Sequence, residues 1–284
     1  MMKALAVLLW PAGIAAILAV TALLAKRSGG PASAAAPMNG RHASDPAVSP
    51  RSARSSIIGL LLILAVGTVI VFVLMAPLGM LVVHWGPHID KPVYTWTVQH
   101  RVHFWKWVMY RLTKVGDAWT TWGAAVTAAI CLAAFYRKNK WLPPVALGAA
   151  IIVDHYLTAA LRRAFQRIGP PGRPHGVFPS GACTDIILFY GLIAYLIWRE
   201  ASGSKRAAIW MCGVLAALGF SEAYSREYLT LHWFTDIISG LIYGALMLAA
   251  FVITIRLVDG PARQAGSERS ADQVLAGQRS PARQ

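Results

Sequence analysis

The chain of 284 residues is 56% hydrophobic and only 14% charged, with a mean hydropathy of +0.51. This composition excludes an ordinary soluble globular protein and favours a polytopic membrane protein. The net charge of +15 does not indicate nucleic-acid binding, because the basic residues cluster between apolar runs, as in cytoplasmic loops of membrane proteins. The cysteines lie singly in apolar segments and predict neither a disulfide nor a metal site: Cys131, Cys183 and Cys212.

The first apolar run, 4–25, follows Lys3 and ends at Lys26-Arg27. Its length favours a retained transmembrane helix or signal anchor within residues 1–27; the alternative is a cleaved secretory signal. Residues 28–56 are Ser, Ala, Pro and Gly with scattered arginines, which predicts a disordered linker.

Six further apolar runs predict an all-α fold, a polytopic membrane helical bundle with a six-helix core in addition to the N-terminal helix. The core is expected over residues 57–256, followed by a disordered cytoplasmic tail over 257–284. The predicted spans are 57–83, 118–136, 142–161, 184–198, 207–224 and 233–255.

Residues 85–116, between the first two of these spans, interleave tryptophan and tyrosine with lysine and arginine. This mixture predicts a helix that lies in the membrane interface. The histidines of the region lack acidic or thiol partners, so no metal site is expected at His84, His88, His100 or His103.

The basic loops at 137–140 and 199–206, together with Lys26-Arg27 and the tail, are expected to be cytoplasmic. Seven crossings then place the remaining polar segments on the other side, so the chemistry would face away from the cytoplasm. The composition suggests a bacterial inner membrane. The segments gathered on the far side are 85–116, 162–182 and 225–232.

Residues 225–236, SREYLTLHWFTD, run directly into the last span. On a helix, His232 and Asp236 share one face, where the carboxylate can accept a proton from one imidazole nitrogen and leave the other free to attack. Arg226 could hold a phosphate beside the ring. The pattern favours nucleophilic catalysis at phosphorus; the alternative is that Arg226 and Asp236 pair at an interface and His232 caps a helix.

The spacing SR-x5-H-x3-D resembles the third signature of the type 2 phosphatidic acid phosphatase (PAP2) superfamily, which includes lipid phosphatases, polyprenyl-diphosphate phosphatases and vanadium haloperoxidases. The resemblance covers roughly residues 57–256. It implies that His232 forms a phosphohistidine, that Asp236 orients it and that Arg226 stabilises the phosphate. It implies no metal and no other cofactor, because arginines and helix-end amides neutralise the phosphoryl oxygens.

The segment 162–170 resembles the first signature of the same superfamily, with departures. Arg162 stands at its lysine position and Arg167 at an additional arginine, and both are therefore expected to bind the substrate phosphate. Gly169 stands where a further arginine is expected, and Arg173 could supply the lost charge.

Pro179-Ser180-Gly181-Ala182 resembles the second signature, Pro-Ser-Gly-His. Ser180 and the amides around Gly181 are expected to bind phosphate at the start of a helix. The histidine that protonates the leaving oxygen in the family is replaced by Ala182. Three outcomes stay open: a diphosphate substrate that needs the proton less, a substitute acid at Asp185 or His175, or loss of turnover.

The resemblance thus implies an integral-membrane phosphatase or phosphotransferase acting on a lipid phosphate or polyprenyl diphosphate, with membrane lipids and no nucleic acid as partners. The alternative is a non-catalytic binder or transporter of phosphorylated lipids that uses the same pocket; a vanadate-dependent oxidase comes third. Glu222 is expected to pair with Arg226, one helical turn away. Asp154 and His155 are expected to form a polar contact between helices.

Overall fold

The chain is all-α in the part that the computed structural model describes, which is residues 50–136, 139–173, 175–201 and 203–278, with side chains between 56 and 258. The predicted helix within 1–27 and most of the linker lie outside these residues. The helices are α2 Pro50–Gln99, α3 His103–Leu112, α4 Ala118–Phe135, α5 Leu142–Phe165, α6 Gly181–Asp185, the π-helical turn η1 Ile186–Tyr190, α7 Gly191–Glu200, α8 Lys205–Tyr228 and α9 Phe234–Gln278.

Six helices of the described part are long and apolar enough to cross a membrane, with α6, η1 and α7 forming one continuous helix. Their outer surfaces are apolar; on α2, for example, Leu62, Val66 and Val69 are each more than 60% exposed. Such surfaces are stable when lipid surrounds them. The protein is therefore a multi-pass integral membrane protein, as the composition predicts.

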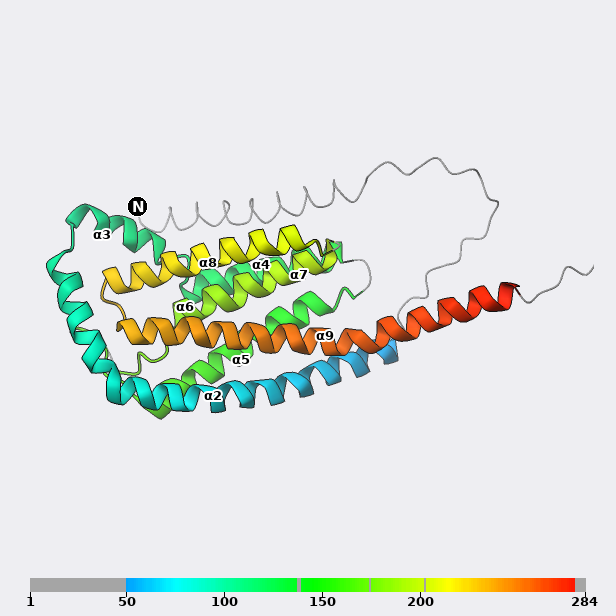
Figure 1. Ribbon diagram of the computed structural model, residues 1–284, viewed down its shortest axis with the longest axis horizontal. Coiled ribbons are helices and arrows are strands. Elements are labelled where there is room, and N and C mark those ends of the chain that lie inside the picture. The colour runs from blue at the N-terminus through cyan, green and yellow to red at the C-terminus, as the bar shows by residue number, and fades with distance from the viewer. Residues whose placement is uncertain (1–49, 137–138, 174, 202, 279–284) are drawn as a thin grey trace, which may run out of the picture.

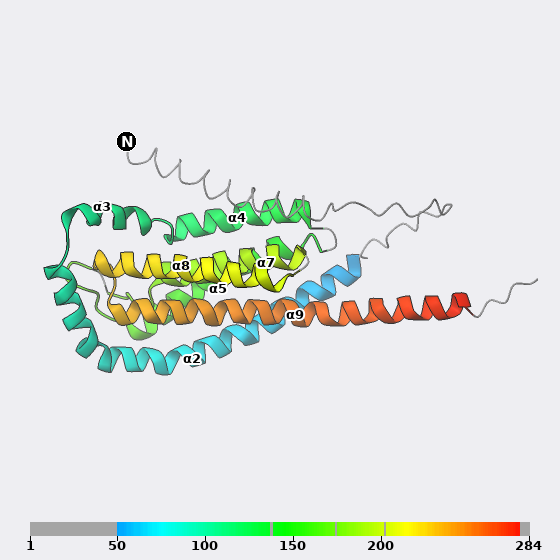
Figure 2. The same cartoon turned by 45° about the horizontal axis from the view of Figure 1, so that its top comes forward.

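The continuous helix Gly181–Glu200 forms the centre of the bundle. In its apolar window 67% of the residues are buried, the largest share among the six spans. Helices α4, α5, α8 and α9 run beside it, whereas α2 lies outside them against α9 and α5 (Figures 1 and 2). The large side chains in the hydrophobic core of the bundle include Phe178, Phe189, Tyr243 and Phe251.

Helix α2 bends before it ends. Its 50 residues would extend about 75 Å, more than twice the roughly 30 Å hydrocarbon core of a bilayer. Pro77, Pro87 and Pro92 lie inside it, and each removes a backbone hydrogen bond of the helix. The C-terminal part of α2 turns across one end of the bundle and leads to α3 (Figure 1). The predicted interfacial segment 85–116 therefore covers this end.

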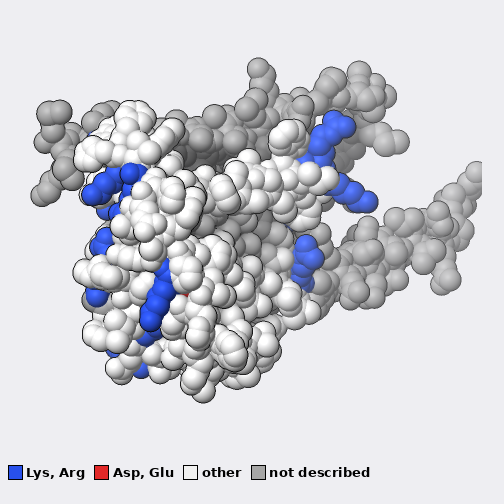
Figure 3. Space-filling view, turned by 60° about the vertical axis from the view of Figure 1, so that its left-hand side comes forward, with Lys and Arg blue, Asp and Glu red and all other residues white. Residues whose placement is uncertain are grey.

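Helix α3 packs on the end of α8 through a small apolar cluster of Met109, Tyr228 and Leu229. Its other face exposes aromatic side chains, among them Phe104, Trp105 and Trp107. Lysine and arginine are spread over this end of the molecule, with almost no acidic side chain at the surface (Figure 3). The exposed cations of the segments that form this end are Lys91, Lys106, Lys114, Arg163 and Arg173.

Helices α6 and α9 approach each other so closely that two glycines of α9 touch the backbone of α6. A Cβ atom on Gly240 would lie 2.5 Å from the carbonyl oxygen of Ser180, and one on Gly244 would lie 2.7 Å from that of Thr184. The Thr184 hydroxyl donates to the Gly240 carbonyl at 3.1 Å. This small-residue contact holds the Ser180 turn against the start of α9.

We expect Gly240→Ala to lower the free energy of unfolding by about 1–3 kcal/mol, because the added methyl group meets a backbone carbonyl that cannot rotate away. Gly213→Ala on α8 is the matched control, since a Cβ there meets nothing within 4 Å. Thermal unfolding in detergent compares the two. Equal stability of both variants would contradict the close helix contact.

Two helix ends differ from the predicted boundaries. Helix α2 begins at Pro50, within the predicted linker 28–56. Helix α9 continues to Gln278, past the predicted boundary at 256, although the sequence predicts a disordered tail. Residues of high helix propensity, such as Ala, Arg and Gln, are frequent after 256, and extending an existing helix needs no new nucleation.

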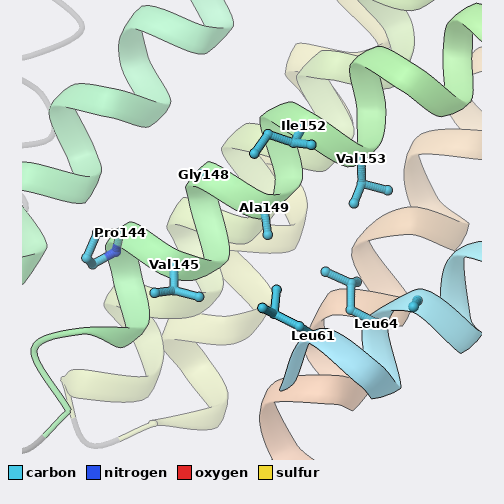
Figure 4. Close-up of a pocket in the computed structure, with 9 residues that line it drawn as sticks. Leu61, Leu64, Pro144, Val145, Gly148, Ala149, Ile152 and Val153 are labelled. Atoms are coloured by element: carbon cyan, nitrogen blue, oxygen red, sulfur yellow. The ribbon is translucent and has the colours of Figure 1, made fainter. Parts of the chain in front are cut away.

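An apolar groove of about 410 Å³ lies between α2 and α5 (Figure 4). Leu61 and Ile152 line it and are exposed, so the groove opens towards the surrounding lipid. Its lining has no charged or hydrogen-bonding side chain and cannot bind a phosphate. The polar residues predicted to act lie instead at the end covered by α2 and α3.

Candidate functional site

Three separate segments meet at the covered end of the bundle: the loop after α5, the turn before α6, and the turn between α8 and α9. The Ser180 amide donates to the Asp236 carbonyl oxygen at 3.1 Å. The Trp233 indole donates to the Ile168 carbonyl oxygen at 2.7 Å. These bonds bring residues that are distant in the sequence to one place around His232.

His232 lies in the turn before α9 and is half-buried. Its Nδ1 is 3.1 Å from the carbonyl oxygen of Val177. A carbonyl oxygen only accepts hydrogen bonds, so Nδ1 carries the proton and Nε2 keeps a free lone pair. The ring is therefore held in the tautomer that a nucleophile at Nε2 requires.

Burial and the positive charges of Arg226 and Arg162 lower the pKa of His232 to about 3, although the hydrogen bond to Val177 opposes them. The ring is therefore neutral, and able to attack, throughout the range from pH 5 to 8. An unfolded histidine has a pKa near 6.5 and binds a proton below that pH, whereas the folded ring stays neutral. His232 therefore lowers the free energy of unfolding as the pH falls from about 6.5 to about 3.

The Asp236 carboxylate does not take the predicted role of orienting His232. It accepts a hydrogen bond from Arg167 and another, at 3.3 Å, from the Trp233 amide. Helix α9 begins at Phe234, so His232 lies in the turn outside the helix, and the four-residue spacing does not stack the two side chains. The carbonyl of Val177 takes the place that the sequence assigns to Asp236.

Arg167 is buried between two carboxylates, those of Asp90 on α2 and Asp236 on α9. It also donates to the Thr235 hydroxyl at 2.9 Å. We call Asp90, Arg167 and Asp236 the ion triad. Because its guanidinium is already neutralised by two partners, Arg167 is placed to hold helices together and not, as predicted, to bind the substrate phosphate.

Asp90 is a site residue that the sequence reasoning missed. Besides Arg167, its carboxylate accepts from the Thr235 amide at 2.9 Å and the Thr235 hydroxyl at 2.8 Å, so it caps the first turn of α9 from another helix. Gly86 makes room, since a Cβ there would lie 2.5 Å from Arg167. The available signal was a single aspartate inside a long apolar helix.

Arg226 is also held by two acidic side chains but keeps one nitrogen free. Its Nε donates to Glu222 at 2.7 Å, as the spacing predicts, and its Nη2 donates to Asp117 at 2.6 Å and to the Thr113 carbonyl oxygen at 3.1 Å. Nη1 makes no hydrogen bond to the described residues. This nitrogen is available to a phosphate oxygen, as expected for Arg226.

The carboxylate of Asp117 is ionised in this arrangement. Burial alone would raise the pKa of Asp117, but hydrogen bonds and charge from Lys114 and Arg226 outweigh burial and lower it below the usual value. Asp117 therefore fixes the orientation of Arg226 as a charged acceptor.

Arg162 and Ser180 present unpaired polar groups to the same place. A Cβ on Gly181 would lie 2.8 Å from Nη2 of Arg162, and within the described part of the chain the buried Nε of this arginine has no partner. The Ser180 hydroxyl is buried and, apart from the weakly donating Cys183 thiol, has no hydrogen-bond partner among the described residues. Unpaired donors beside the first turn of α6 suit an oxyanion.

The two candidate substitute acids make their contacts with other residues. Asp185 is buried and hydrogen-bonded to Thr121, at 3.2 Å, and to Asp154 across the bundle, so Asp154 makes the predicted contact between helices. His175 is exposed and its backbone bridges to Ile168. The described residues include no group of three or more His, Cys, Asp or Glu side chains arranged to hold a metal.

The two remaining polar residues named from the sequence are His155 and Arg173. The ring of His155 packs edge-on against Trp122 of α4, with ring centroids 5.7 Å apart. Arg173 is exposed in the loop, and its positive charge also acts on His232. It is thus near enough to the ring to contribute charge at the site.

Comparison with protein-family models and with curated proteins finds no match. A solved structure is similar: the transmembrane PAP2-type phosphatidylglycerolphosphate phosphatase from Bacillus subtilis. Its TM-score is 0.58 at 21% sequence identity, and the match covers 69% of this chain and 96% of that one. The chain has the PAP2 fold. In this PAP2-fold protein the convergent polar site lies at one end of the helical bundle, built by the three segments that carry the sequence signatures.

Proposed function

We propose that this PAP2-fold protein is an integral-membrane phosphatase or phosphotransferase that acts on a lipid phosphate or polyprenyl diphosphate through a phosphohistidine at His232. The observation that carries the proposal is the setting of this ring: its Nδ1 lies 3.1 Å from the Val177 carbonyl oxygen, and its Nε2 makes no hydrogen bond to the described residues. Burial and the nearby guanidinium groups lower its pKa to about 3. A base held in this way beside guanidinium groups is an activated nucleophile next to an anion site.

In the proposed reaction, Nε2 of His232 forms a bond to phosphorus while the bond from phosphorus to the leaving oxygen breaks, and the leaving oxygen takes up a proton. Water, or an acceptor alcohol, then attacks phosphorus and breaks the bond to nitrogen, which restores the neutral ring. Arg162, the free Nη1 of Arg226 and the amides at Gly181 stabilise the phosphoryl oxygens in both steps.

A lipid substrate is supported by the position of the site and by the similar structure. The site lies at a membrane-facing end whose exposed surface combines aromatic side chains with lysine and arginine (Figure 3). Such a surface suits anionic head groups. The similar protein from Bacillus subtilis is a phosphatidylglycerolphosphate phosphatase.

We also propose that the site faces the extracytoplasmic side of a bacterial inner membrane. The opposite end of the bundle carries Lys140, Arg199, Lys205 and Arg206 in the short connections between spans. Positive charge in short loops favours the cytoplasmic side, and the exposed cations of the site end lie mostly in the long interfacial segment 85–116.

The second candidate function is a non-catalytic binder or transporter of phosphorylated lipids. The observation that favours it is Ala182, which cannot protonate a leaving oxygen. Such a protein would bind the phosphate with the same arginines and amides and would form no covalent intermediate.

The experiment that separates the two functions is phosphate release by the purified full-length protein in detergent, from a panel of lipid phosphates and a polyprenyl diphosphate. We expect release from at least one substrate and inhibition by vanadate, which mimics the five-coordinate phosphorus of the transition state. Binding of the panel lipids without any release would leave the binder as the function and would overturn the enzyme.

A further inference from the structure

Glu222 of α8 is a buried acid beside the start of α6. A Cβ placed on Gly116 would lie 2.6 Å from Cδ of Glu222 and 3.0 Å from the carbonyl oxygen of Ala182, so the carboxyl group and the start of α6 flank the same point. Glu222 is only 2% exposed. Because Gly116 has no side chain and Ala182 only a methyl group, no long side chain from either residue screens the carboxyl.

The two oxygens of this carboxyl have different surroundings. Oε1 accepts from Arg226 at 2.7 Å and from the Thr113 hydroxyl at 3.2 Å. Oε2 is buried and has no hydrogen-bond partner among the described residues. A buried, unpaired carboxylate oxygen is costly, whereas a proton on Oε2 turns it into a donor that needs only an acceptor.

The carboxyl also borders the expected phosphate position. It holds Nε of Arg226, whose free Nη1 is available to a phosphoryl oxygen, so Glu222 and the phosphate share one guanidinium. The other charged group packed against this pair is Asp117, which Arg226 and Lys114 neutralise. Cys183 and Tyr190 are the further titratable neighbours of Glu222.

We propose that Glu222 is the general acid that protonates the leaving oxygen, an assignment that rests on the proposed phosphatase function. As the bond between phosphorus and the leaving oxygen breaks, the proton on Oε2 passes to that oxygen and yields an alcohol and a carboxylate. Arg226 stabilises the carboxylate. In the second step the carboxylate takes a proton from the attacking water and the acid is restored.

The test compares two leaving groups on the full-length protein in detergent. A long-chain alkyl phosphate has a strongly basic leaving oxygen and needs the proton, whereas p-nitrophenyl phosphate does not. We expect Glu222→Gln to slow the alkyl ester by about a hundred- to ten-thousand-fold and the aryl ester by less than about tenfold. Glu227→Gln, the same change on the same helix, is the control and should slow neither.

An equal loss on both esters would overturn the assignment and show that Glu222 only positions Arg226. No loss on either ester would overturn it as well. If the wild type turns over neither ester, the proposed function fails first and the general acid fails with it.

The pH profile of the wild type keeps the assignment testable should Glu222→Gln not fold. The alkyl rate should fall with rising pH, as the proton of the acid is lost, at pH values where the aryl rate is constant. Parallel profiles for the two esters would overturn the assignment.

Discussion

We expect His232→Asn to release phosphate at least about ten-thousand-fold more slowly than the wild type, because removal of a nucleophile removes the covalent route altogether. Asparagine has no basic nitrogen to attack phosphorus, whereas Arg162, Arg226 and the amides at Gly181 stay in place. Binding of the substrate should therefore change much less than turnover. The loss should appear in kcat, with KM within about tenfold of the wild type.

The measurement is phosphate release from the best substrate of the panel, together with trapping of labelled phosphate on the protein by a quench in alkaline denaturant, since a phosphohistidine is stable to base. The wild type should carry acid-labile label, and His232→Asn should carry none. The control is His103→Asn, the same substitution at an exposed histidine of α3, which should behave as the wild type. A His232→Asn variant with wild-type turnover would remove the phosphohistidine from the proposal.

The wild-type pH profile adds a check on the same residue. Since the pKa of His232 is lowered to about 3, turnover of the aryl ester should show no acidic limb from this ring between pH 5 and 8. A histidine of ordinary pKa would lose activity as the pH falls through about 6.5. Suppose that His232→Asn abolishes turnover and that the wild type nevertheless shows such an acidic limb. The arginines and burial would then not lower the pKa of His232 as the geometry implies.

The second large effect is expected on stability. Asp90→Ala should lower the free energy of unfolding by about 3–5 kcal/mol, because it removes one of the two carboxylates that neutralise the buried guanidinium of Arg167. It also removes the acceptor of the Thr235 amide at the start of α9, which adds the loss of a helix cap.

Unfolding of the detergent-purified variant by heat or by denaturant measures this effect. Asp90→Asn is the matched comparison, because the amide oxygen can still accept from Thr235 while the negative charge is lost, so we expect it to be intermediate. A loss below about 1 kcal/mol for Asp90→Ala, the range of exposed ion pairs, would show that Asp236 alone compensates Arg167.

The ion triad explains why Arg167, a predicted phosphate ligand, is better understood as a residue that holds helices together. The sequence places Arg162 and Arg167 on the same short segment, and both were expected at the phosphate. Of these two arginines, Arg162 has a buried nitrogen without a partner among the described residues. Arg167 lies between Asp90 and Asp236, and Asp90, on α2, precedes it by 77 residues in the sequence. No local pattern relates these two positions.

The predicted contact between His232 and Asp236 is also absent because it depends on tertiary structure. The four-residue spacing to Asp236 predicts contact only when both residues are within one helix, and α9 begins two residues after His232. The hydrogen bond to Val177 comes from the loop before α6, which the sequence gives no means to place. By contrast, Glu222 and Arg226 both lie in α8, and their predicted pairing is found.

The sequence by itself determined that the chain is an all-α membrane protein, where its spans lie and which residues are candidates, because hydropathy and helical spacing are properties of contiguous residues. Only the tertiary structure decided the partners: Val177 for His232, Asp90 and Asp236 for Arg167, and Glu222 beside Ala182. These contacts join different helices and turns, and their geometry depends on how α2 bends over the end of the bundle and how closely α6 and α9 approach.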